Sequence, residues 1–168
     1  TLSGSNTYSG LTTIGSGTLS LANAGALGGG GSVTFTGGTL NFGVSGFTFS
    51  NPVTASGSSM LFNTNGNVAT WSGNIDSSNT GVLTKLGVGT LTLSGSNSFT
   101  GMTTVSQGTL IAGHSMAFGG GGSVSVSSGA GFAYMPSVSA PLNIGGTFSF
   151  TGGGYLGTSI GAVGTGAM

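Results

Sequence analysis

The chain has 168 residues, 38 of them glycine, and it carries one Lys or Arg, one Asp or Glu, one His and no Cys. Without cysteine it forms no disulfide bonds, so a fold must rest on backbone pairing and packing. A surface with so little charge has no long-range field, which excludes electrostatic attraction of nucleic acids, anionic membranes or charged substrates.

Short predicted strands follow one another along the chain. Polar and apolar residues alternate with a period of two, the pattern of half-buried strands. The runs lie at 18–21, 33–36, 39–42, 47–49, 60–62, 68–71, 82–86, 90–94, 123–127, 131–134 and 147–150. They are rich in Thr, Val, Leu and Phe, which suit a pleated surface. No stretch has helical spacing, so we expect almost no helix.

One stretch occurs twice, at a constant offset of 91 residues. Both copies open with Thr-Leu-Ser-Gly-Ser-Asn, at residues 1 and 92, and roughly 19 of the first 33 positions are identical. A fixed period of this kind is the signature of a stacked repeat architecture. We therefore divide the chain into a first copy over 1–91 and a second, incomplete copy over 92–168, which together form one continuous rod.

Three short strands with their turns make a coil of roughly 20 residues, the usual size of a solenoid repeat. Adjacent coils would stack at about 4.8 Å, so the sequence predicts an all-β, single-stranded parallel β-helix, or β-solenoid, of about eight coils. Each coil is stable only through its neighbours. We expect the repeat-equivalent Leu19 and Leu110 both to point inward, and Tyr8 and Phe99 to pack in one column.

The second copy contains a recognisable motif. It reads Gly-Val-Gly-Thr-Leu-Thr-Leu-Ser-Gly at 87–95, Asn-Ser-Phe-Thr-Gly at 97–101, Thr-Thr-Val at 103–105 and Gly-Thr-Leu at 108–110. This order resembles the passenger-associated repeat of bacterial autotransporters, and Leu-Thr-Lys-Leu-Gly at 83–87 resembles its lead-in. The resemblance implies a right-handed parallel β-helix exposed outside the cell, without catalytic residues in the repeats.

Few residues could carry chemistry. His114 is the only histidine and Asp76 the only carboxylate side chain, whereas zinc sites need several His or Cys ligands and glycoside hydrolysis normally needs two carboxylates. We expect His114 to lie in a solvated turn and Asp76 to hold a turn through its side chain. We predict no catalytic, cofactor-binding or metal-binding residues, no cofactor, and no enzyme activity.

Two surface features could bind a ligand. Trp71, Tyr8, Phe99 and Tyr134 could stack on sugar rings, although packing in the core is the better interpretation. The Thr-x-Thr runs at 34–36 and 90–92 could form ladders that bind ice, but they are not repeated in register in every coil.

We interpret the chain as a segment of an extracellular structural β-solenoid at a bacterial cell surface. Uncapped strand edges would let copies assemble end to end into a fibre or surface layer. The alternative is the stalk of an autotransporter-type adhesin, and a second alternative is an ice-binding solenoid. The expected partner is the chain itself, with a surface glycan or host contact as a further candidate. Nucleic-acid binding is not expected, because the chain has almost no positive charge. Membrane insertion is not expected, because no run of about 18 apolar residues is present.

The shortage of charge also predicts how an assembly responds to solution conditions. Asp76 and Lys85 are the only charged side chains, so assembly should depend little on salt. Reference pKa values leave only Asp76, His114 and the chain termini to titrate between about pH 3 and 10, so we expect little pH dependence there.

Overall fold

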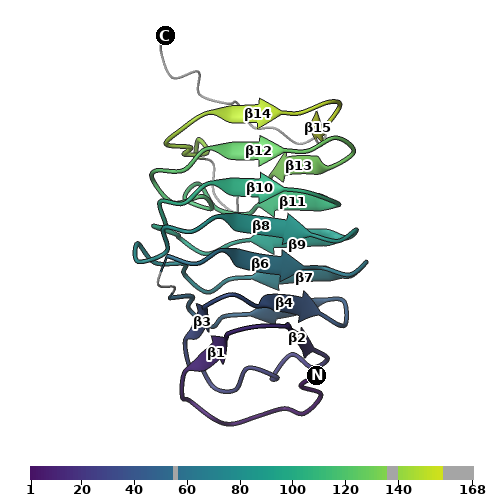
Figure 1. Ribbon diagram of the computed structural model, residues 1–168, viewed down its shortest axis with the longest axis vertical. Helices are drawn as coiled ribbons and strands as arrows, with labels where there is room; N and C mark the ends of the chain where they lie inside the picture. The colour runs from purple at the N-terminus through teal and green to yellow at the C-terminus, as the bar shows by residue number, and fades with distance from the viewer. Residues whose placement is uncertain (55–56, 136–139, 157–168) are drawn as a thin grey trace.

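The computed structural model describes residues 1–54, 57–135 and 140–156, and it shows an all-β parallel solenoid of about six turns (Figure 1). The described residues form strands and turns without a helix. The strands are β1 (Thr12–Ile14), β2 (Thr18–Leu21), β3 (Val33–Phe35), β4 (Thr39–Phe42), β5 (Phe47–Phe49), β6 (Met60–Asn63), β7 (Val68–Trp71), β8 (Leu83–Leu86), β9 (Thr90–Leu93), β10 (Thr103–Val105), β11 (Thr109–Ala112), β12 (Val124–Val126), β13 (Gly131–Tyr134), β14 (Phe148–Phe150) and β15 (Tyr155–Leu156).

Two long parallel sheets form two faces of the rod. The seven-stranded sheet has the order β14-β12-β10-β8-β6-β4-β2, and the six-stranded sheet has the order β15-β13-β11-β9-β7-β5. A third face begins with the parallel pair β1-β3 and continues upward through the bridges Val33–Val53 and Val53–Ile75. The chain therefore visits three faces in each coil and climbs by one strand spacing per coil.

The coils are slightly longer than the sequence predicts. Partners in register lie between 19 residues apart, as for Leu91 and Leu110, and 24 residues apart, as for Ser125 and Ser149. The rod therefore has about six turns, fewer than the eight expected. The difference arises because the turns absorb extra residues and because residues 157–168 lie outside the described part.

Alternate residues of each strand point into the rod and stack in columns. In the six-stranded sheet, Leu110 is in register with Leu91 below it and Phe132 above it, and it is fully buried. In the seven-stranded sheet, Leu19 is in register with Leu40. Leu19 packs against the core but is only half-buried, because β2 is the last strand of its sheet. The prediction that Leu19 and Leu110 both face inward is confirmed.

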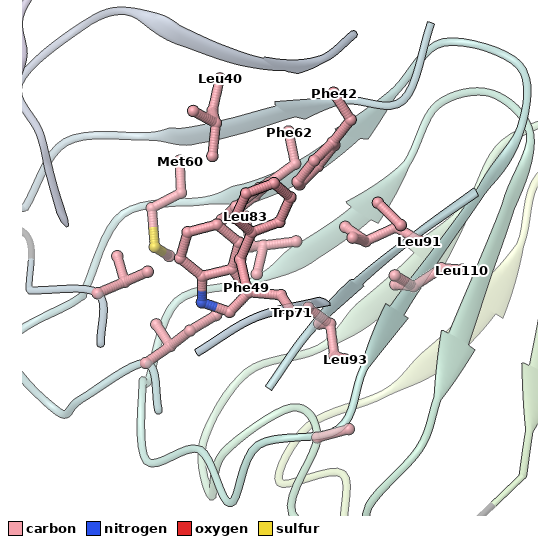
Figure 2. Close-up of a cluster of buried hydrophobic side chains, with 14 of the residues drawn as sticks. Leu40, Phe42, Phe49, Met60, Phe62, Trp71, Leu83, Leu91, Leu93 and Leu110 are labelled. Carbon is pink, nitrogen blue, oxygen red and sulfur yellow. The ribbon is translucent and has the colours of Figure 1, made fainter. Parts of the chain in front are cut away.

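An aromatic cluster fills the lower half of the core (Figure 2). Phe42, Phe49, Phe62 and Trp71 come from four strands, β4 to β7, in two successive coils, and their paired ring centroids lie 5.4 to 6.4 Å apart. Such edge-to-face and offset arrangements add to the stabilisation that burial alone gives. The cluster joins the two long sheets across the interior.

The second repeat copy is turned by one face relative to the first. β2 and β11 are equivalent at the offset of 91 residues, yet β2 lies in the seven-stranded sheet and β11 in the six-stranded sheet. Likewise, β1 and β3 pair on the third face, whereas their equivalents β10 and β12 lie in the seven-stranded sheet. Because the coils contain 19 to 24 residues, 91 residues cover four turns and one further face.

This rotation overturns one expectation. Tyr8 lies in the segment between Leu2, which bridges to the seven-stranded sheet, and β1 of the third face. Phe99 lies between β9 and β10, which belong to the two long sheets. The two rings are on different faces, so the prediction that they share one column is wrong. The repeat period is not a whole number of coils, so equivalent residues of the two copies lie on different faces. The prediction assumed that they lie on the same face.

A disulfide test can check the rotated register. The hydroxyls of Thr34 and Thr54 lie 3.0 Å apart on the third face. Because the chain has no cysteine of its own, the double variant Thr34→Cys/Thr54→Cys should form one intramolecular disulfide on mild oxidation, measured by thiol titration. Ser125 and Ser149 are in register in the second copy, and the residues 91 positions earlier are Thr34 and Ser58. The control pair is therefore Thr34→Cys/Ser58→Cys, which would be in register if the two copies were not rotated. Cross-linking of the control pair alone would contradict the rotation.

The inward columns make a second testable difference. Leu110→Asp places a carboxylate without a partner in the core, which should cost several kcal/mol of unfolding free energy. Leu19→Asp, at the equivalent but half-buried position, should cost clearly less. Urea denaturation measures both variants. Equal unfolding midpoints for Leu110→Asp and the parent would show that the assigned register is incorrect.

Candidate functional site

The repeated motif places one asparagine where two coils meet. Asn97 Nδ2 donates to the carbonyl of Ala117 at 2.7 Å, and its Oδ1 accepts from the N–H of Ile75 at 2.9 Å. In the first copy, Asn6 Nδ2 donates to the carbonyl of Ala26 at 2.8 Å. Each amide therefore satisfies backbone groups of an adjacent coil, which would otherwise be costly to bury.

The glycine runs of the motif allow the backbones of successive coils to touch. A Cβ atom on Gly119 would lie 2.1 Å from the carbonyl oxygen of Phe99, and one on Gly28 would lie 2.1 Å from that of Tyr8. Gly122 is equally close to its neighbour, with a Cβ position 2.0 Å from the carbonyl oxygen of Gly101. Both copies make the same contact on different faces of the rod. The motif thus encodes a contact between coils rather than a position on one face.

Two substitutions within one glycine run test whether a glycine is needed because two coils touch there or only because the run is rich in glycine. Gly122→Ala would bring a methyl group against the Gly101 carbonyl, whereas a Cβ on Gly120 meets nothing within 4 Å. We expect Gly122→Ala to lower the thermal unfolding midpoint by several degrees, as a loss of more than about 1 kcal/mol does in a domain of this size. Gly120→Ala should leave the midpoint nearly unchanged. Equal midpoints for the two variants would show that the coils are not in this contact.

Asp76 and His114 each accept a hydrogen bond from the backbone two residues ahead. Asp76 Oδ1 accepts from the N–H of Ser78 at 3.0 Å and from Asn79 Nδ2 at 2.9 Å. The prediction that Asp76 holds a turn is confirmed. His114 Nδ1 accepts from the N–H of Met116 at 3.0 Å, and the ring is half-buried.

The aromatic candidates lie mainly in the core. Trp71 and Phe99 are fully buried, and Tyr134 is 3% exposed. Tyr8 is half-buried, and its hydroxyl lies 3.0 Å from that of Thr12. Three of the four rings are therefore out of reach of a sugar. The indole N–H of Trp71 has no hydrogen-bond acceptor among the described residues.

The two candidate threonine ladders do not join into one array. Thr90 and Thr92 lie on the outer surface of the six-stranded sheet, in register with Val68 and Thr70 of β7 below them. Thr34 lies on the third face beside Thr54. The hydroxyl rows are therefore short and divided between faces.

Lys85 is the residue that the sequence analysis missed. It occupies an inward position of β8, in register with Phe62 and Val105, and its side chain is fully buried. Its Nζ donates to the carbonyls of Leu86 at 3.0 Å, Gly87 at 2.6 Å and Gln107 at 3.1 Å. The alternation of Leu83, Thr84 and Lys85 was the available signal, because it places Lys85 on the inward side with Leu83.

This environment changes the expected response to pH. Burial lowers the pKa of the Lys85 amine from 10.5 to about 8, because a charged form loses its hydration inside the rod. The expectation that only Asp76, His114 and the termini titrate between pH 3 and 10 is therefore wrong.

The described residues offer no further centre for chemistry. They contain no group of three or more His, Cys, Asp or Glu side chains that could hold a metal ion. A helix long and apolar enough to cross a membrane is likewise not found among them. The polar side chains described above serve turns, corners and contacts between coils.

Comparison with known proteins agrees with this arrangement. Residues 1–21 and 83–112 match the family model described as the passenger-associated-transport-repeat. An 85-residue stretch, 48% of this chain, is 47% identical to the "Adhesin BmaC autotransporter" of Brucella suis biovar 1 (strain 1330). The chain covers 2% of that relative's length. No solved structure matches the chain.

The matched spans contain some of the residues that join coils, whereas the glycine runs at 28–31 and 119–122 lie outside them. The span 83–112 includes Lys85, Asn97 and the two strand pairs around them, and 1–21 includes Asn6. Repeats of this family are typically non-catalytic, and they imply a segment that is secreted or exposed at the cell surface. Two segments of the chain therefore match the passenger-associated transport repeat, and the chain is a distant homologue of an autotransporter adhesin.

Proposed function

We propose that this segment is a rigid, uncharged spacer in the stalk of an autotransporter-type adhesin. The observation that carries the proposal is that two parallel sheets run along about six turns of a chain whose repeats match passenger repeats. Such a stalk holds other parts of a passenger away from the cell surface. Each added coil extends its reach by about 4.8 Å, the spacing of paired strands.

The interior explains why a rod of this composition can be stiff. Backbone hydrogen bonds link each described coil to the next, and buried side chains, apolar except at Lys85, continue in columns from one repeat copy into the other. Bending the rod would open these contacts on one side and compress them on the other. With one Lys, buried in the core, and one Asp, the surface also attracts few charged molecules, which suits a spacer.

The similarity to an adhesin supports a stalk role for this chain more than it supports a binding site within it. That protein is called an adhesin, and this chain covers 2% of its length. The spacer proposal assigns adhesion to other parts of a longer passenger, and it assigns these residues the task of keeping a fixed distance.

A second candidate is end-to-end assembly into a fibre, and one observation favours it. A cavity of about 260 Å³ is lined by residues of β13, β14 and β15 and of the segment before β14. Figure 1 shows these strands at one end of the rod. The lining of the cavity is apolar and consists of Phe132, Tyr134, Leu142, Ile144, Phe148, Phe150 and Leu156. A second copy stacked there would make a head-to-tail contact that does not close, and such contacts produce filaments.

One set of measurements separates the two candidates. Small-angle X-ray scattering and negative-stain electron microscopy of the purified chain are recorded over a wide range of protein concentrations. The spacer proposal predicts single rods of constant length at every concentration and no retention of host cells on a surface coated with the chain. Rods that lengthen with concentration would favour the fibre. Retention of cells by the coated chain would contradict the spacer proposal.

A further inference from the structure

Lys85 is a buried cation in a column of apolar side chains. Its register partners are Phe62 on β6 below and Val105 on β10 above. The side chain is fully buried, although most buried lysines are paired with an anion. The spacer function gives no role to a charge at this position.

The amine lies at a corner where three successive coils meet. Nζ donates to Leu86 and Gly87 in its own coil and to Gln107 in the coil above. From the coil below, the Thr64 hydroxyl lies within hydrogen-bond distance of the carbonyls of Leu86 at 3.3 Å and Gly87 at 3.2 Å. The hydroxyl has one hydrogen and lies closest to the Val88 carbonyl, at 2.9 Å, so it serves one of these carbonyls at a time. The Leu86 carbonyl also accepts from the Thr64 N–H at 3.1 Å and therefore has a second donor.

The charge on Lys85 has no counter-ion at this corner. Asp76 is the only carboxylate side chain in the sequence, and it is hydrogen-bonded to Ser78 and Asn79. The strands packed around Lys85, which are β6, β7, β9 and β10, carry no titratable side chain, and neither do the corners at 87–89 and 106–108. The carbonyl dipoles are the compensation that the geometry provides, and a buried charge without an anion is costly.

We propose that the corner around Lys85 is a proton-controlled clasp between three coils, which tightens when Nζ loses a proton and loosens when Nζ is protonated. A neutral amine still has two hydrogens to donate. One can serve Gln107 and the other Gly87, and the Leu86 carbonyl keeps the hydrogen bond from the Thr64 N–H. Loss of the proton thus removes the buried charge without leaving a carbonyl bare.

The direction of the effect follows from proton linkage. The pKa of Lys85 is about 8 in the folded rod, against a reference value of 10.5. Between these two values the unfolded chain binds more protons than the folded chain, so stability rises with pH in that window. Below about pH 8 both states are protonated, and the clasp stays in its looser form.

The first experiment measures the amine directly. Lys85 is the only lysine in the chain. A single lysine Cε resonance therefore reports its titration by NMR. The proposal expects a midpoint near pH 8, with the amide shifts of Gly87 and Gln107 following the same midpoint. A Cε midpoint above pH 10, or corner amides that do not respond, would overturn the clasp.

The second experiment measures stability against pH for the parent and for Lys85→Met, an unbranched apolar replacement. For the parent relative to the variant, the unfolding equilibrium constant should fall by up to about tenfold per pH unit between pH 8 and 10. The comparison cancels the contributions that all other groups make equally in the two proteins. A difference that does not change with pH would overturn the proposal. If Lys85→Met does not fold, Lys85→Arg, which keeps its charge, should remove the same pH dependence.

Discussion

The structure depends on direct contact between the backbones of successive coils. Just before the strands of the seven-stranded sheet, a Cβ on Gly81 would lie 2.0 Å from the carbonyl oxygen of Ser58, and one on Gly101 would lie 1.9 Å from that of Gly81. Gly122 repeats this contact with Gly101 at 2.0 Å. A side chain at any of these positions would separate two coils and break the hydrogen bonds between them. The high glycine content is therefore a requirement of close stacking as well as of tight turns.

Polar groups inside the rod are satisfied by the neighbouring backbone. Asn51 and Asn97 are buried, and their amides donate to carbonyls of adjacent coils. Lys85 and Thr64 do the same at another corner. Corners leave backbone carbonyls outside the sheet ladders, and a side chain that reaches up or down one coil supplies the missing donor. These residues link coils where the strands cannot.

Much of the fold follows from local pattern, and the errors have physical causes. Alternation located most strands because each strand has one buried and one exposed side, as in the Thr-Leu-Thr-Leu of β9. The inward position of Leu110 followed from the same rule. The number of coils and the shared column of Tyr8 and Phe99 were not predictable in this way, because both depend on the residues that each turn absorbs. Lys85 was missed because composition treats a charge as exposed, whereas three nearby carbonyls hold it inside.

The same contacts connect the fold to the proposed function. A rod whose every coil is held by the coils on either side can vary in its outward residues while it keeps its length and stiffness. The repeat copies illustrate this, since they make one set of coil contacts on two different faces. A passenger built from such repeats can place its surface features around the rod without changing the interior.

The central claim is that each coil is stabilised by the coils on either side. Residue-resolved hydrogen exchange of the isolated chain tests it most directly, because exchange reports the local free energy of opening. We predict the strongest protection in β6 to β11, which have paired strands on both sides, and decreasing protection toward β2 and β14. Rapid exchange in the middle coils with protection confined to either end would contradict it.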